Sequence, residues 1–166
     1  SEPVQVSKSD HAKLQRACAR LGINLIEVTS LVKISDLPSI ACWGHSKESH
    51  DHGEEYIYIS PKALHMPIDL IELVLRHEIL HAAGYDHVGG GKDHQLSNIV
   101  LDVAINFVLA ETYRNQMHRL SKRIYAPETL DSPLALVQSH ITRDMIPNPV
   151  IQKIWSNIWV QGGPVP

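Results

Sequence analysis

The chain has 166 residues, of which 43% are hydrophobic, and this is enough for one compact domain with a hydrophobic core. Its formal net charge of -3 and pI near 6.4 argue against the strongly basic surface of a nucleic-acid-binding domain. The sequence has no apolar run of the ~20 residues that span a membrane, and its polar start does not resemble a signal peptide. We therefore expect a soluble, cytoplasmic protein without a membrane partner.

The first third of the chain is predicted to contain a helix followed by strands. Residues 9–21 begin with Ser-Asp and place apolar residues at helical spacing up to Gly22. The β-branched residues within 23–29 favour a strand, and a second strand is predicted near 40–43. The segment EYIYIS at 55–60 alternates clearly and predicts a third strand.

Two long helices are predicted next, from about 67 to 84 and from about 94 to 120. The apolar residues expected to form the core stripe of the second helix are Leu96, Ile99, Val100, Val103, Ala104, Phe107 and Val108. Its other side is also largely apolar, which leaves a narrow polar line of Asn98, Asp102 and Asn106. Polar groups on so buried a helix are costly unless they have partners.

The last third is rich in proline, which prevents long helices. Two short helices are predicted, near 133–141 and 149–160. Trp155 and Trp159 lie one turn apart on the second and are expected to anchor it. We therefore divide the chain into a main part, residues 1–125, and a C-terminal extension, residues 126–166, packed on the same domain.

Histidine is unusually frequent, with 11 residues, eight of them between His45 and His94. Such clustering suggests metal chemistry. His118 and His140 stand apart and are expected to be ordinary surface or core residues. The two cysteines, Cys18 and Cys42, are too few for a disulfide framework, and we expect them to be reduced.

The segment RHEILHAAGYDH, residues 76–87, concentrates four possible metal-site residues. In a helix His77 and His81 lie one turn apart on the same face, so both imidazoles can reach one ion. Gly84 permits the helix to end, and His87 can then return as a third nitrogen ligand. Glu78, next to the first histidine, would lie beside the ion.

This set of residues suits a catalytic Zn²⁺ site, in which three protein ligands leave a fourth position for water. Glu78 would accept a proton from that water and pass it to a leaving amine. Asp102 is an alternative third ligand; if His87 binds the ion, Asp102 and Asn106 would orient ligands or hold helices together. A second group of possible ligands, His45, His50, Asp51 and His52, is better interpreted as a solvated loop.

The segment HEILHAAGYDH matches the pattern HExxHxxGxxH of metzincin-type zinc peptidases. This resemblance implies that His77, His81 and His87 are metal ligands and that Glu78 is the general base and acid. Met145, in RDMIPN, resembles the methionine turn that these families place under the metal.

The ending GYDH, with the YIYIS strand upstream, also resembles the YbeY family of metal-dependent endoribonucleases. That family has glycine where this chain has Glu78. A third resemblance, over residues 58–110, is to small predicted metallopeptidases of bacteria and phages, in which the HExxH helix is followed by a helix similar to SNIVLDVAIN. All three imply a mixed sheet whose edge strand, here residues 55–60, lines a cleft and can hold an extended peptide.

We therefore predict an α+β, zincin-like domain, with a mixed sheet of about three to four strands packed on the metal-binding helix and a second long helix. Residues 1–125 would be the catalytic domain of a zinc metalloendopeptidase acting on a peptide or protein, and nucleic acid is not an expected partner. One alternative is a YbeY-like endoribonuclease that holds phosphates through Arg114, Arg119, Lys122 and Arg123; another is a non-catalytic, metal-stabilised module. The oligomeric state stays open.

Overall fold

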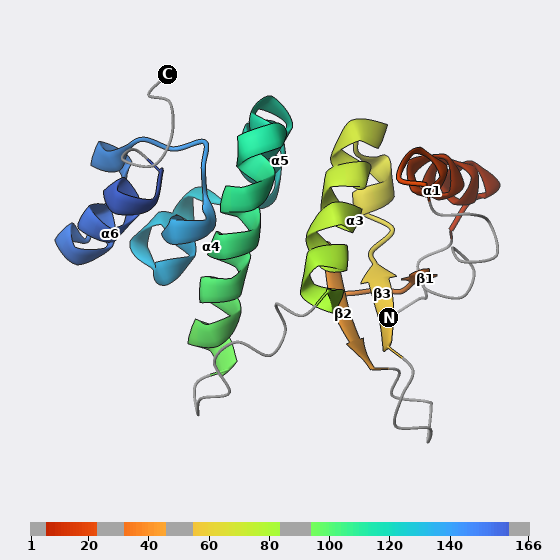
Figure 1. The fold of residues 1–166 in the computed structure, drawn as a ribbon, viewed down its shortest axis with the longest axis horizontal. Helices are drawn as coiled ribbons and strands as arrows, with labels where there is room; N and C mark the ends of the chain where they lie inside the picture. Colours follow the sequence, from red (N-terminus) through yellow and green to blue (C-terminus); the bar gives the residue numbers. More distant parts are fainter. Residues whose placement is uncertain (1–5, 23–31, 46–54, 84–93, 160–166) are drawn as a thin grey trace. The chain divides into compact units, whose positions relative to one another are not determined.

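The computed structural model in Figure 1 describes four stretches of the chain, residues 6–22, 32–45, 55–83 and 94–159. These residues form five α-helices and one three-stranded sheet, which confirms the α+β class. The chain divides into two compact units, residues 1–83 and residues 84–166. The predicted division into a catalytic domain, 1–125, and an extension, 126–166, stays a prediction.

The first unit begins with helix α1, Lys8–Arg20, as predicted to within one residue. Ser7 and Asp10 form a capping box: the Asp10 backbone N–H donates to Ser7 Oγ (3.1 Å), and the Ser7 N–H donates to the Asp10 carboxylate (3.3 Å). Gly22 follows the helix with a φ of 80°, a left-handed conformation that glycine adopts without strain. Local chemistry therefore accounts for both ends of this helix.

The sheet consists of β1 (Val32–Ile34), β2 (Ala41–His45) and β3 (Glu55–Ile59), in the order β1-β3-β2. β3 pairs parallel with β1 and antiparallel with β2. The strands predicted near 40–43 and at 55–60 are confirmed, β1 was not predicted, and the segment 23–29 lies outside the described residues. A mixed sheet of three strands is thus confirmed.

The expectation that residues 55–60 form an edge strand is wrong, because β3 is the central strand and pairs on both sides. The alternation of EYIYIS reports the two faces of the strand: Ile57 and Ile59 are buried, whereas Tyr56 and Tyr58 are half-buried. It carries no information on the neighbours within the plane of the sheet. In the described part of the first unit, β1 and β2 are the edge strands.

Helix α3, Ile68–Ala82, confirms the helix predicted over 67–84 and packs against α1 and the sheet (Figure 1). The short 3₁₀ turn η1, Ala63–His65, connects β3 to it. The buried residues of α3 are Leu70, Ile71, Leu73, Val74, Leu75 and Glu78. Glu78 therefore continues an otherwise apolar buried stripe, at helical spacing from Val74 and Leu75.

The second unit contains α4 (His94–Thr112) and α5 (Arg114–Ile124) where one helix was predicted over 94–120. The prediction is wrong at Tyr113, whose φ of -120° and ψ of 47° interrupt the helical conformation. Apolar periodicity continues through this position, so the pattern alone does not reveal the break.

The predicted core stripe of α4 is also wrong for most of its residues. Leu96, Val100 and Val108 are exposed by 51%, 56% and 45%. Ile99 is buried as predicted, but the other buried apolar residues are Leu101, Ile105 and Leu109, which were expected on the other side of the helix. Because α4 is apolar on nearly every side, the hydrophobic pattern identifies a helix but does not single out its buried face.

The C-terminal residues form three 3₁₀ turns, η3 (Pro127–Asp131), η4 (Pro133–Val137) and η5 (Arg143–Met145), before helix α6 (Pro149–Trp159). The helix predicted over 149–160 is confirmed, whereas that near 133–141 is the shorter η4. Trp155 Nε1 donates to the Gln138 carbonyl (2.9 Å) and Trp159 Nε1 to the Leu136 carbonyl (2.8 Å). The two tryptophans thus anchor α6 as expected.

Both cysteines are free, as predicted, with Cys18 buried and Cys42 half-buried. Among the helices in the described stretches, none combines the length and apolar character that crossing a membrane requires.

Candidate metal centre

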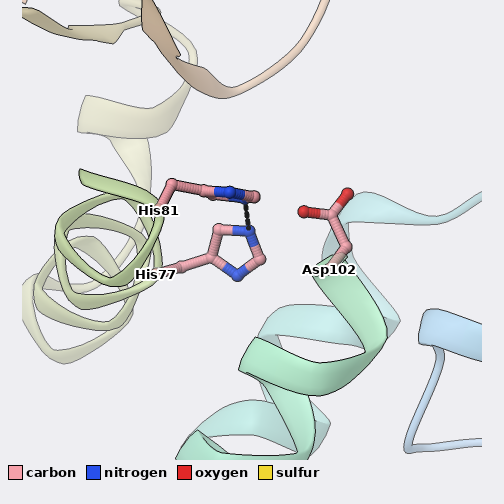
Figure 2. Close-up of side chains that lie close together, drawn as sticks. All are labelled: His77, His81 and Asp102. Atoms are coloured by element: carbon pink, nitrogen blue, oxygen red, sulfur yellow. Dashed lines mark hydrogen bonds between the residues drawn. The ribbon is translucent and has the colours of Figure 1, made fainter. Parts of the chain in front are cut away.

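His77 and His81 form a close pair on successive turns of α3. Their Nε2 atoms lie 3.1 Å apart, their ring centroids are separated by 4.9 Å, and both side chains are half-buried. Figure 2 shows the two rings on α3, joined by the dashed line. The i, i+4 spacing thus brings the two histidines together, as the sequence predicted.

The separation of the two nitrogens suits shared coordination of one ion. A histidine nitrogen lies about 2.0 Å from Zn²⁺, so two such ligands at a tetrahedral angle are about 3.3 Å apart. The same separation is a hydrogen bond when one Nε2 carries a proton and the other does not. If neither Nε2 atom carries a proton, each imidazole would present a nitrogen lone pair to a cation.

Glu78 is only 6% exposed, although it carries a carboxyl group. Burial of an ionisable group is unfavourable unless the surroundings compensate for the lost hydration. Its neighbours in sequence and on the helix include the half-buried His77 and His81. A metal held by these two histidines would need an acid or base beside it, and the carboxyl group of Glu78 could take that role.

Cys42 of β2 lies near Glu78, a proximity that the sequence does not predict. Burial raises the pKa of the Cys42 thiol, and the negative charge of Glu78 raises it further. Cys42 therefore stays protonated at neutral pH. Because the two residues are 36 positions apart in sequence, only the packing of β2 beside α3 reveals their proximity.

The other predicted ligands are placed as follows. His87 lies outside the described residues, as do His50, Asp51 and His52, and His45 belongs to β2. Asp102 is half-buried on α4, in the second unit. Whether His87 or Asp102 is a ligand therefore stays a prediction.

Within the second unit, the polar line of α4 contacts the C-terminal residues. Asn106 is buried, and its Nδ2 donates to the Val137 carbonyl of η4 (3.4 Å). Burial raises the pKa of Tyr125, and the charge of Asp102 raises it further. Asn106 thus helps to hold η4 against α4.

The methionine-turn candidate Met145 is 47% exposed. Its sulfur accepts a weak hydrogen bond from the Thr142 N–H (3.5 Å) at the start of η5. This side chain caps a turn rather than forming part of a buried layer.

His118 and His140, which the sequence left as ordinary residues, belong to one polar cluster of the second unit. Ser121 Oγ and His140 Nδ1 are 2.8 Å apart. Burial lowers the pKa of both histidines; positive charge from Arg114 lowers that of His118 further, and charge from His118 and Lys122 lowers that of His140. The i, i+3 spacing of His118 and Ser121 was visible in the sequence, but the approach of His140 was not.

Comparison with known proteins adds no relative: no protein-family model, curated protein or solved structure matches this chain.

Proposed function

We propose that this protein is a zinc-dependent metallopeptidase that hydrolyses peptide bonds with a water molecule activated beside α3. The observation that carries the proposal is the His77–His81 pair, with Nε2 atoms 3.1 Å apart, on the helix that also buries Glu78. The sequence pattern HExxHxxGxxH supports the same interpretation.

Each residue has a distinct role in this proposal. His77 and His81 would hold the ion. When bound, Zn²⁺ would lower the pKa of a coordinated water toward ~7 and polarise the substrate carbonyl. Glu78 would accept a proton from the attacking water and deliver it to the departing amine. Its carboxyl group is buried, and burial strengthens a carboxylate as a base because it disfavours the charged form.

The third ligand is proposed from the sequence. His87 follows the end of α3 by a few residues and would supply a third nitrogen; Asp102 is the alternative and would supply an oxygen. Three nitrogens leave the ion with a full positive charge of two, whereas a carboxylate would reduce it. The His87 set would therefore acidify a bound water more strongly.

The substrate would bind in extended form at an edge of the sheet. Since β3 is central, we assign this role to β2, the antiparallel edge strand that packs beside α3. Cys42 on this strand lies close enough to Glu78 to sense its charge. A peptide paired with β2 would thus pass near the proposed base.

The test is a Glu78→Gln substitution in the zinc-loaded chain. Cleavage of an unfolded protein such as reduced casein, followed by mass spectrometry, should slow by ~10²-fold or more, while the zinc content stays the same. Glu72→Gln is the matched control, because Glu72 lies on the same helix and forms an ion pair with Arg20. Equal cleavage by the Glu78 variant, or none by the unaltered zinc-loaded chain, contradicts the proposal.

The same samples distinguish the two alternatives. A ribonuclease would cleave single-stranded RNA and leave casein intact. A structural metal module would cleave neither, and chelation would lower its melting temperature.

A further inference from the structure

Helix α5 concentrates positive charge that the near-neutral composition of the chain conceals. After residue 83 the chain has seven Lys and Arg residues and seven Asp and Glu residues. Four of those cations, Arg114, Arg119, Lys122 and Arg123, lie within the 11 residues of α5, and none of the acidic residues does. The second unit therefore has one strongly basic element.

Three of the four cations lie away from the buried side of the helix. Met117, Leu120 and Ser121 are 2%, 4% and 2% exposed and face the core. Arg119, Lys122 and Arg123 are exposed, and Arg114 and His118 are half-buried.

Three of the basic side chains form a row along α5. Arg114, His118 and Lys122 repeat every four residues and so lie on one side of the helix. With a rise of about 1.5 Å per residue, this row is about 12 Å long.

His140 adds a basic group from the turn that follows η4. Its Nδ1 lies 2.8 Å from Ser121 Oγ, and because Ser121 is buried, this contact fixes the imidazole beside α5. The charge of Lys122 and of His118 reaches His140, and that of Arg114 reaches His118. Positive charge therefore acts on both imidazoles, and a bound anion would favour their protonated forms.

We propose that α5 and His140 form a binding surface for a chain of phosphate groups, such as the backbone of single-stranded RNA. The row is longer than a single phosphate needs, and guanidinium, ammonium and imidazole groups are the usual phosphate partners. The sequence of α5, RNQMHRLSKRI, has no Phe, Tyr or Trp on which bases could stack. Binding is therefore electrostatic, independent of base sequence and sensitive to salt.

The experiment measures fluorescence anisotropy of a labelled uridine oligonucleotide of about 20 nucleotides, with the full chain, as salt is raised. If the four Lys and Arg residues of α5 all contact phosphates, the affinity for RNA should fall by ~50-fold between about 50 and 200 mM salt. Each contact contributes about -0.7 to the slope of log affinity against log salt concentration. For the double variant Lys122→Gln, Arg123→Gln, the fall should be only ~7-fold. Both residues are exposed, so the variant should fold normally.

Lys153→Gln, which removes an exposed lysine of α6, is the matched control and should bind like the unaltered chain. No binding by the unaltered chain at about 50 mM salt, or equal salt slopes in the double variant and the unaltered chain, overturns the proposal. Inorganic polyphosphate should compete with the RNA; polyphosphate binding without RNA binding overturns the assignment to nucleic acid. Glu78→Gln should bind RNA normally, so this proposal and the peptidase proposal can fail separately.

Discussion

Helices α3 and α5 place their ionisable side chains in opposite environments. On α3, Glu78 is buried and the two histidines are half-buried, whereas on α5 three of the four arginine and lysine side chains are exposed. A desolvated group interacts strongly with a few close neighbours, whereas exposed charges act together through a field that salt screens. Single substitutions on α3 should therefore have large effects on zinc binding, whereas RNA binding by α5 should depend on the number of charges.

The largest effect is expected from His81→Ala. Loss of one imidazole from the pair should weaken zinc binding by ~10³-fold, which corresponds to about 4 kcal/mol. Competition with a chromogenic zinc chelator measures the affinity. His65→Ala, which removes an exposed histidine of the same unit, should leave it unchanged. Equal affinity in both variants would show that the pair on α3 is an ordinary hydrogen-bonded contact.

Burial should also decide how far a substitution on α4 lowers the free energy of unfolding. Ile105 is 1% exposed and Val100 is 56% exposed, although both are apolar residues of one helix. Ile105→Ala should lower the free energy of unfolding by about 2–5 kcal/mol, and Val100→Ala by less than about 0.5 kcal/mol. Urea denaturation, monitored by tryptophan fluorescence, measures both free-energy changes. A larger loss for Val100 would mean that this side of α4 is covered in solution.

The third ligand gives a smaller but sharper difference. If His87 binds the ion, His87→Ala should weaken zinc binding by ~10²-fold, about 2.7 kcal/mol, and Asp102→Asn by no more than the ~10-fold typical of a residue that only orients a ligand. The opposite order would identify Asp102 as the ligand. The chelator competition described for His81 distinguishes the two results.

The part of the fold and site that the sequence predicted is the part that depends on local spacing. The pairing of His77 with His81 follows from 3.6 residues per turn, and the start of α1 follows from its capping residues. The central position of β3 and the approach of His140 to Ser121 did not follow, because both depend on residues distant in sequence. The buried face of α4 was not predicted, because apolar residues lie on nearly all sides of this helix and polar residues do not mark an exposed face.

The smallest predicted effect concerns pH and the cluster around His140. The pKa of His140 and of His118 lies below the ordinary value of 6.5, so between these values the unfolded chain binds more protons than the folded one. Stability should therefore be highest above about pH 6.5 and should fall as the pH drops through the folded-state values.

His140→Gln removes one of these groups while keeping a polar side chain near Ser121, and it should reduce the loss of stability between about pH 7.5 and pH 5. His11→Gln, an exposed position on α1, is the control. If the His140 variant loses as much stability on acidification as the unaltered chain, burial and the positive charges of His118 and Lys122 do not act on this imidazole, and the basic surface on α5 would lack its contribution from His140.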